Sequence, residues 1–437
     1  MSANNKGIWE GLLSDTRIGG EKSIDEPGRT PFNSDHDRIV FSGAFRRLAK
    51  KTQVHPLASN DHVHNRLTHS LEVACVGRSL GNRAGEHIRA HLPVGMSPRD
   101  IGDIVEAACL AHDIGNPPFG HTGENAIGQW LSDTLADNRY LSSEEKDDLC
   151  AFEGNAQGFR VVTTTEYRVF AGGMKLTYST LGAFMKYPWL QGKGPKEDKF
   201  GAFLSEKSYF YEVVSSLGMK RISEDCYARH PLAHLMEAAD DFCYRLLDVE
   251  DAIEMGILDW SDFSETFAPI LGNTSDRIGE LRPGQRPVAV RGRIISSFID
   301  SAAQAFKNHE GQLISGEVNS LLELCSDDVK EALSNAKTIA NERIFNHPRK
   351  IELEIGSYRV IGTILSIITD ALVNNESGVS KQVIKLIGPS TLNSHSASLD
   401  DVTMYERFRR AIDFVSGMTD NYATFLASQF NGWGGTR

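Results

Sequence analysis

Histidine and aspartate residues that could bind a metal ion occur at three separated places in the sequence. They are His69 in HNRLTHSLEV, the adjacent pair His112 and Asp113 in ACLAHDIGNPPFGHTGE, and the pair Asp240 and Asp241 in MEAADDFCY. Two imidazoles with two carboxylates suit a divalent cation, and such mixed ligands favour Mn, Fe, Co, Ni or Zn over Ca and suit Mg less well. We therefore expect a site for one divalent metal ion.

Helix geometry distinguishes the two late aspartates. If residues 231–256 form one helix, the residues three, four and seven positions from Asp240 are mostly apolar, as Met236 and Leu247 illustrate. The corresponding neighbours of Asp241 are mostly charged. Asp240 therefore borders the inward face of the helix, and we favour it as the metal ligand, with Asp241 as the alternative.

A second polar cluster follows the His-Asp pair. His121 and Glu124 are three residues apart in HTGE, so they share a face if a helix begins there. One interpretation is a solvated turn followed by a glutamate that complements the helix dipole. The other is a general acid–base pair beside the metal.

The elements that must position these residues are helices. Six segments carry apolar residues at helical spacing, and they are residues 70–90, 101–114, 231–256, 291–309, 326–345 and 400–428. The second of them stops at Gly115, and the third starts at Pro231, which suits a first helical turn.

Two segments interrupt the helical pattern. Residues 187–203 are rich in glycine, proline and lysine, and we expect a long loop that is either a mobile surface insert or functional. Residues 350–360 alternate between apolar and polar types, which predicts a short strand or hairpin.

The composition excludes several classes of protein. The chain has 437 residues, 40% of them hydrophobic, and a net charge of -12, so it is neither disordered nor a typical binder of nucleic acid duplexes. Its longest apolar stretch, residues 360–373, is shorter than the roughly 20 residues that span a bilayer. The amino-terminal residues do not show the pattern of a secretory signal. The chain has six cysteines, and none of them form a CxxC motif. We expect a cytoplasmic protein that does not bind membranes.

The run AHDIGNPPFGHTGE, preceded by NRLTHSLEV and followed by MEAADDFCYRLLDVEDA, resembles the dNTP triphosphohydrolase branch of the HD superfamily, and specifically the bacterial dGTPase-like proteins. The resemblance extends from FRRLAKKTQV near residue 45 to FVSGMTDNYA near residue 414. It implies an all-α HD-domain fold with extra helices and a minor β-hairpin or loop insertion. We expect one large helical domain over residues 1–437, with a metal-binding core near 60–255 and a carboxy-terminal helical region near 290–437.

The resemblance also implies roles for individual residues. The metal ligands would be His69, His112, Asp113 and Asp240, and His121 and Glu124 would act in catalysis. Of the substrate contacts, Gln53 and Asp248 would bind the 3′-hydroxyl of the deoxyribose, Tyr244 would stack on the sugar where a 2′-hydroxyl would clash, and Arg66 would meet the phosphates. We favour Mn or Mg as the metal, with Ni, Co, Fe and Zn as alternatives.

The implied reaction is hydrolysis of a deoxynucleoside triphosphate, with dGTP favoured, to deoxynucleoside and tripolyphosphate. Basic side chains must balance the triphosphate charge. The candidates near in sequence are Arg46, Arg47, Lys50, Lys51 and Arg66, although the RRLAKK run could equally be a solvated helix face. A homo-oligomer is implied, with a hexamer favoured.

Two other functions stay open. One is a different HD-type nucleotide phosphohydrolase, acting on monophosphates, cyclic nucleotides or guanosine tetraphosphate. The other is a nucleotide-sensing regulator that binds single-stranded DNA. A zinc protease site at His230 and His234 in HPLAH is disfavoured, because the motif lacks the glutamate of H-E-x-x-H.

Overall fold

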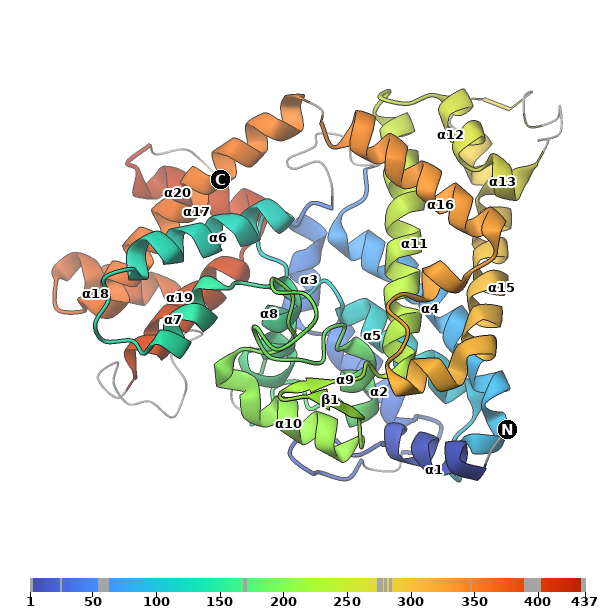
Figure 1. Ribbon diagram of the computed structural model, residues 1–437. Coiled ribbons are helices and arrows are strands. Elements are labelled where there is room, and N and C mark those ends of the chain that lie inside the picture. The colour runs from blue at the N-terminus through green and yellow to red at the C-terminus, as the bar shows by residue number, and fades with distance from the viewer. Residues whose placement is uncertain are drawn as a thin grey trace.

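The computed structural model is built almost entirely from helices (Figure 1). It describes residues 3–23, 26–53, 63–167, 171–272, 278, 281–282, 285–346, 348–388 and 402–433. Within these residues the paired strands form a two-stranded antiparallel sheet of β1 (Arg221–Ser223) and β2 (Cys226–Tyr227). The predicted all-α fold with a minor β-hairpin is confirmed.

The helices of the first half are α1 (Ala3–Leu12), α2 (Pro31–Val40), α3 (Gly43–Arg47), α4 (Arg66–His87), α5 (Pro98–Ala111), α6 (Gly120–Leu135), α7 (Ser143–Cys150), α8 (Gly154–Arg160), α9 (Tyr178–Phe184) and α10 (Lys207–Ser216). Those of the second half are α11 (Pro231–Glu254), α12 (Trp260–Thr266), α13 (Ala268–Leu271), α15 (Arg286–Ser315), α16 (Asp327–Ile339), α17 (Pro348–Val373), α18 (Gly378–Ile387), α19 (Met404–Ser416) and α20 (Asp420–Phe430).

Helices α4, α5 and α11 form the centre of the larger apolar core. Two glycines let α4 and α5 approach closely, because a Cβ atom on Gly81 would lie only 2.8 Å from the Cα atom of Gly102. Larger side chains at these positions would push the helices apart. The close packing brings the start of α4 next to the end of α5, where the predicted metal ligands lie.

Most predicted helices are present with shifted ends. Helix α4 begins where the side chain of Asn65 accepts hydrogen bonds from two backbone N–H groups, and α11 has Pro231 in its first turn. Helix α5 ends at Ala111, three residues earlier than predicted. The predicted helix 400–428 is two helices, because the chain turns at Gly417 and a new helix is capped by Thr419.

The prediction of a strand or hairpin at residues 350–360 is wrong, because this segment forms the first turns of α17. The alternation that suggested a strand comes from Ile351 and Ile355, which are exposed on one side of the helix. An ion pair between Lys350 and Glu354, four residues apart, is compatible with the helix and not with a strand. Short apolar patterns of this kind do not distinguish helix from strand.

Helix α17 organises a second apolar cluster by packing against α6, α18, α19 and α20. The apolar stretch 360–373 is therefore part of a longer helix than expected. In the described part of the chain, the segment Lys350–Val373 is long and apolar enough to cross a membrane by length and composition alone, and 44% of its most apolar window is buried inside the protein.

The predicted loop at residues 187–203 contains no helix, but it is not a mobile surface insert along its whole length. Trp189 and Phe200 are buried, and a parallel bridge joins Leu190 to Ala202. The two ends of the loop are therefore fixed against the protein. Its lysine-rich middle is exposed.

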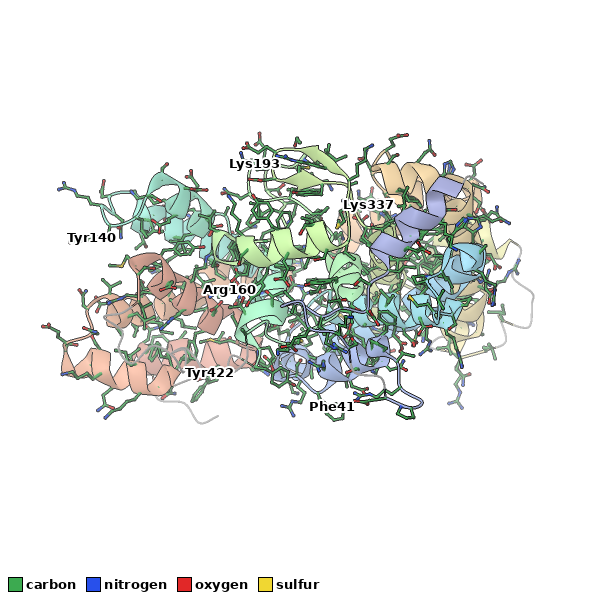
Figure 2. The ribbon with its side chains drawn as sticks, turned by 90° about the horizontal axis from the view of Figure 1, so that it is seen from below. Phe41, Tyr140, Arg160, Lys193, Lys337 and Tyr422 are labelled. Atoms are coloured by element: carbon green, nitrogen blue, oxygen red, sulfur yellow. The ribbon has the colours of Figure 1, made fainter. Side chains whose placement is uncertain are left out.

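The two apolar clusters are joined through α8, whose Arg160 appears near the middle of Figure 2. The Nε atom of Arg160 donates to Asp413 Oδ1 of α19 at 2.8 Å, and a second donor atom contacts Asp413 Oδ2 at 2.9 Å. Helices α6 and α7 pack in the cluster of α17–α20, whereas α15 and α16 pack in the larger core. The division into a core near 60–255 and a region near 290–437 stays a proposal.

Candidate metal centre and active-site cavity

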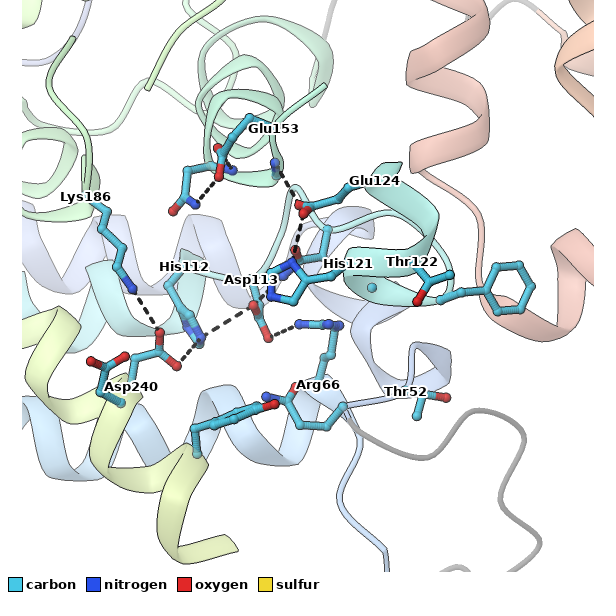
Figure 3. A pocket seen from close by; sticks show the side chains of 18 of the residues that line it. Thr52, Arg66, His112, Asp113, His121, Thr122, Glu124, Glu153, Lys186 and Asp240 are labelled. Carbon is cyan, nitrogen blue, oxygen red and sulfur yellow. Dashed lines mark hydrogen bonds and ion pairs between the residues drawn. The ribbon is translucent and has the colours of Figure 1, made fainter. Parts of the chain in front are cut away.

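Three of the predicted metal ligands converge from three different helices, and Figure 3 labels two of them, His112 and Asp240. The ring of His69 comes from the first turn of α4, His112 caps the end of α5, and Asp240 lies inside α11. Asp240 Oδ1 is 3.2 Å from His69 Nε2 and 3.3 Å from His112 Nε2. One ligand atom from each residue lies within 4.8 Å of the other two. This spacing suits a single cation between them.

The hydrogen bonding of His112 leaves one ring nitrogen available to a cation. Its Nδ1 atom donates to the carbonyl oxygen of Cys109 at 2.6 Å, so Nε2 is the ring nitrogen that faces the cluster. That Nε2 atom is buried without a hydrogen-bond partner. Burial disfavours protonation of His112, but Asp113 and Asp240 outweigh it and raise its pKa to about 9. The cluster attracts positive charge, and the residues present fit a divalent metal.

Asp113 lies beside this group, with its Oδ1 atom 3.6 Å from His112 Nε2. Its other oxygen accepts a hydrogen bond from Arg66 at 2.8 Å, and Asn116 donates to Oδ1. Burial opposes ionisation, but Arg66 outweighs it and lowers the pKa of Asp113. The four predicted ligands therefore lie at one place, three in mutual reach and the fourth adjoining them.

The neighbouring Asp241 is not part of the converging group. It lines the same cavity, and burial raises its pKa, whereas Asp240 contacts both imidazoles. The helix-face argument thus selected the aspartate that the fold aims at the histidines.

His121 and Glu124 form a hydrogen-bonded pair at the start of α6 (Figure 3). His121 Nδ1 lies 2.8 Å from Glu124 Oε2, and Glu124 Oε1 accepts a hydrogen bond from the backbone N–H of Gly154 at 2.9 Å. The side chain of Glu124 is buried, whereas that of His121 is 81% exposed. A fixed carboxylate therefore orients an accessible imidazole, which is the arrangement that proton transfer needs.

These groups line one cavity of about 370 Å³. His112, Asp113 and Asp240 lie on its wall, together with His121 and Glu124. Four cationic side chains also line the cavity, namely Arg66, Lys186, Lys199 and Lys350. A group of candidate metal ligands, an oriented imidazole and these cations in one cavity suit an anionic substrate that is cleaved by water.

Comparisons with known proteins identify the family to which this chain belongs. The HD domain family matches residues 66–149. The deoxyguanosinetriphosphate triphosphohydrolase-like protein of Pseudomonas aeruginosa (strain LESB58) is 43% identical over 97% of this chain and 98% of its own length. The protein of the same name from Synechocystis sp. is 37% identical over 97% and 99%, and the deoxyguanosinetriphosphate triphosphohydrolase of Cronobacter sakazakii is 32% identical over 90% and 92%. This chain belongs to the deoxyguanosinetriphosphate triphosphohydrolase family.

The basic side chains that line the cavity are mostly not the ones that the sequence predicted to balance the phosphate charge. Of the five basic candidates, Arg66 lines the cavity. Lys51 is buried and donates to the carbonyl oxygens of Asn116 and Ser416, facing a separate cavity with Arg47, while Arg46 and Lys50 are exposed. Burial lowers the pKa of Lys51 to about 7. These four residues do not line the cavity, and their role in binding phosphates stays a prediction.

Two lysines that the sequence did not single out, Lys186 and Lys199, line the cavity instead. They flank the loop whose ends are buried through Trp189 and Phe200, so the fold brings them to the cavity wall. Lys186 Nζ lies 3.6 Å from Asp240 Oδ2. Burial opposes the charge on Lys186, but the nearby carboxylates, led by Asp240, raise its pKa and keep it protonated. The lysine-rich composition of the segment was the one available signal.

Three of the four predicted substrate residues line the cavity, and Asp248 does not. Gln53 and Tyr244 line the cavity, and Asp248 is buried one turn further along α11. Gln53 Oε1 and Asp248 Oδ2 are buried without hydrogen-bond partners. Polar atoms left in this state usually have an unplaced partner, such as a ligand or water.

The histidines of HPLAH lie outside the metal cluster. His230 caps α11, where Nδ1 accepts from Leu232 and Nε2 donates to the carbonyl oxygen of Leu12. His234 is buried with neither ring nitrogen hydrogen-bonded. Burial lowers the pKa of His230 to about 4 and that of His234 to about 3. Both are neutral structural residues, as the missing glutamate predicted.

The substitution His234→Leu should make the protein less sensitive to acid. In the unfolded chain His234 binds a proton below its ordinary pKa of about 6.5, whereas in the folded chain it stays neutral down to about pH 3. The free energy of unfolding therefore decreases as the pH falls from about 6.5 toward about 3. Between pH 7 and pH 5 the wild type should lose about 2 kcal/mol more unfolding free energy than the variant. Urea midpoints followed by circular dichroism at both pH values measure this. Equal losses in the two proteins would contradict a neutral His234.

Proposed function

We propose that this chain hydrolyses deoxynucleoside triphosphates, dGTP among them, to deoxynucleoside and tripolyphosphate in a metal-dependent reaction. The observation that carries the proposal is the convergence of His69, His112 and Asp240, the last two of which line one cavity with the His121–Glu124 pair and the cations Arg66, Lys186 and Lys199. The names of the relatives, which are triphosphohydrolases over nearly the whole chain, support the same activity.

In this proposal His69, His112, Asp113 and Asp240 hold one divalent ion, with Mn or Mg favoured and Ni, Co, Fe or Zn as alternatives. Such an ion polarises a phosphate oxygen and lowers the pKa of water. His121 transfers a proton, either to the leaving 5′-oxygen or from the attacking water. Glu124 holds the imidazole in position through the 2.8 Å hydrogen bond.

The phosphates occupy the part of the cavity that carries the three cations. A triphosphate has about four negative charges, and preorganised positive groups in a partly closed cavity stabilise them strongly. Arg66, held by Asp113, and the charged Lys186 lie next to the metal cluster, while Lys199 lies 3.4 Å from Glu153. These side chains orient the triphosphate so that the α-phosphorus faces the metal.

The deoxyribose lies further along α11. Asp240, Tyr244 and Asp248 follow at intervals of four residues, so each lies about 6 Å beyond the previous one on nearly the same face. Tyr244 stacks on the sugar, and the unpartnered oxygens of Gln53 and Asp248 bind the 3′-hydroxyl. A 2′-hydroxyl would meet the ring of Tyr244, which is how the site rejects ribonucleotides.

Replacing Tyr244 by alanine should relax the choice of sugar. With the ring removed, the ratio of kcat/KM for dGTP over GTP should fall by about tenfold or more, because a steric filter on one hydroxyl is lost. Steady-state kinetics with both nucleotides measures the ratio. Metal content should stay unchanged, since Tyr244 is outside the metal group. An unaltered ratio would remove Tyr244 from this role.

The decisive experiment incubates the purified full chain with each dNTP in Mn or Mg buffer and identifies the products by chromatography. Equimolar deoxynucleoside and tripolyphosphate are expected. Orthophosphate or pyrophosphate instead would indicate another type of HD phosphohydrolase. Absence of hydrolysis of every dNTP would refute the proposed function.

We also propose that the protein is a cytoplasmic homo-oligomer, with a hexamer favoured, and that single-stranded DNA is a further ligand to test. Sedimentation velocity gives the subunit number, and salt-sensitive retention on immobilised single-stranded DNA tests binding.

A further inference from the structure

Asp420 connects two segments beside the cavity that are far apart in the sequence. Its side chain is buried. Its Oδ1 atom accepts a hydrogen bond from the backbone N–H of Phe119 at 3.0 Å, and its Oδ2 atom accepts one from the backbone N–H of Thr52 at 2.9 Å. Thr52 is followed by Gln53, and Phe119 lies two residues before His121. A single carboxylate therefore fixes the backbone next to both of these side chains.

Asp420 stands in the first turn of α20, where an acidic side chain often caps the helix or complements its dipole. The side chain that caps α20 is instead that of Thr419, which accepts a hydrogen bond from the backbone N–H of Tyr422. The hydrogen bonds from Thr52 and Phe119 come from outside α20. They hold other segments in place rather than helping α20 to form.

The start of α6 depends on contacts with other elements. Phe119 has a φ of 65°, a conformation that non-glycine residues seldom adopt, and its side chain does not cap the helix. A Cβ atom on Gly120 would lie only 2.8 Å from a guanidinium nitrogen of Arg66. The first turn of α6, which carries His121, is therefore positioned closely and from outside, and Asp420 is one of the groups that do so.

Lys51 makes a second link between the same parts of the chain. Its side chain is buried, and Nζ donates to the carbonyl oxygen of Ser416, the last residue of α19, at 2.7 Å. Nζ also donates to the carbonyl oxygen of Asn116, in the loop that leads to α6. The turn between α19 and α20 thus contacts the segment before Gln53 and the loop before His121 through two different groups.

We propose that Asp420 is a positioning residue for the hydrolysis, which holds His121 and Gln53 at a fixed spacing. This inference rests on the proposed function, in which His121 transfers a proton and Gln53 binds the 3′-hydroxyl of the substrate. Asp420 is not among the residues that line the cavity, so it acts through its two backbone contacts. The two ends of the deoxyribose are then aligned by segments that share one carboxylate.

The isosteric variant Asp420→Asn tests this role in the full chain. Asparagine has one acceptor oxygen, and its amino group would face a backbone N–H, so one of the two segments is released. The value of kcat/KM for dGTP should fall by about tenfold or more, because small displacements of reacting groups are costly. Metal content should match the wild type.

Double-mutant cycles show whether Asp420 acts through the two side chains. D420N is combined with His121→Ala and, separately, with Gln53→Ala. In at least one of these backgrounds the further loss of kcat/KM should be less than about twofold, because the side chain that Asp420 positions is already absent. A general loss of stability would instead reduce activity by the same factor in every background.

The variant Thr52→Pro removes one hydrogen bond and leaves the buried carboxylate unchanged, so it tests the inference even if D420N does not fold. Proline has no N–H, and Lys51 has the extended conformation that suits a residue before proline, with φ of −112° and ψ of 130°. KM for dGTP should rise by about threefold or more. KM for 2′,3′-dideoxy-GTP should not rise, because this analogue has no 3′-hydroxyl for Gln53 to bind.

The variant Asp148→Asn is the matched control. Asp148 is also a buried aspartate that accepts a hydrogen bond from a backbone N–H, that of Leu204, at 2.9 Å. Its other oxygen accepts from the hydroxyl of Tyr405 at 2.6 Å, so it joins α7 to α19 without touching the segments at the cavity. D148N should keep the wild-type kcat and KM.

Three results would each overturn the inference. They are wild-type kinetics in D420N, losses in D420N that are additive with both H121A and Q53A, and an equal rise in KM for dGTP and its dideoxy analogue in T52P. A loss of activity in D148N that shows the same coupling to H121A would also overturn it. In all these cases the wild type still cleaves dNTPs, whereas failure of the proposed function means that no dNTP is hydrolysed.

Discussion

Replacing Asp240 by asparagine is expected to abolish metal binding and turnover together. Asp240 Oδ1 lies 3.2 Å and 3.3 Å from the two imidazoles, so this carboxylate is the group that both histidines share. Asparagine keeps the size of the side chain but removes its charge, leaving His69 and His112 with one nearby carboxylate. Loss of the metal removes several kcal/mol of transition-state stabilisation, which corresponds to a decrease in kcat/KM of about 10³-fold or more.

The measurement pairs elemental analysis of metal content after gel filtration with steady-state kinetics on dGTP. Asp241→Asn is the matched control, since it makes the same change one residue away on the same cavity wall. That variant should keep its metal and lose less than about tenfold in kcat/KM, because Asp241 does not contact the histidines. Retained metal in D240N, or loss of metal in D241N alone, would show that the proposed ligand set is wrong.

The helices that hold the site could be predicted because local and tertiary signals agree in them. Helix α11 has a proline in its first turn and a continuous buried stripe, and α4 has a capping asparagine before its apolar face. Helix α17 could not be predicted at its start, because Ile351 and Ile355 face solvent and their spacing carries no information about a core. The apolar residues at the start of α17 therefore mark its exposed side and not the side that packs against the protein.

The metal ligands could be predicted in part because each sits on a regular element. The helix face separates Asp240 from Asp241 without any tertiary information, whereas the pairing of α4 with α5 had to come from the family resemblance. The close contact of Gly81 with Gly102, which sets that pairing, has no distinct sequence signature.

The lysines that line the cavity could not be predicted for a related reason. Lys186 and Lys199 reach the cavity through a loop whose path is set by burial of Trp189 and by the bridge of Leu190 to Ala202. Proximity in sequence to Gln53 pointed instead to Lys51, which the fold turns toward Ser416. Charge near a motif thus indicates little unless the direction of each side chain is known.

The position of the proton-transferring pair depends on several backbone contacts rather than on its own helix. Phe119 precedes α6 in a left-handed conformation, with φ of 65°, and its N–H donates to Asp420 Oδ1 at 3.0 Å. Non-glycine residues adopt this conformation at a cost of about 1–3 kcal/mol, which the surrounding structure must offset. The first turn of α6 is therefore held from the α20 side through Asp420 and from the α8 side through Gly154.

Replacing His121 by alanine is expected to stop turnover while leaving the metal in place. His121 is outside the converging ligand group, and its contact is to Glu124, so its removal does not disturb His69, His112 or Asp240. A positioned acid or base contributes about 10²–10⁴-fold, and kcat should fall by that factor. Metal content by elemental analysis should match the wild type, in contrast to D240N.

The variant Glu124→Gln separates orientation from proton transfer. It keeps the imidazole and a hydrogen-bonding side chain but removes the carboxylate that fixes the ring at 2.8 Å, so a smaller loss of about 10–100-fold is expected. Wild-type turnover in H121A would remove His121 from the reaction, and loss of metal in that variant would instead make it a part of the metal site.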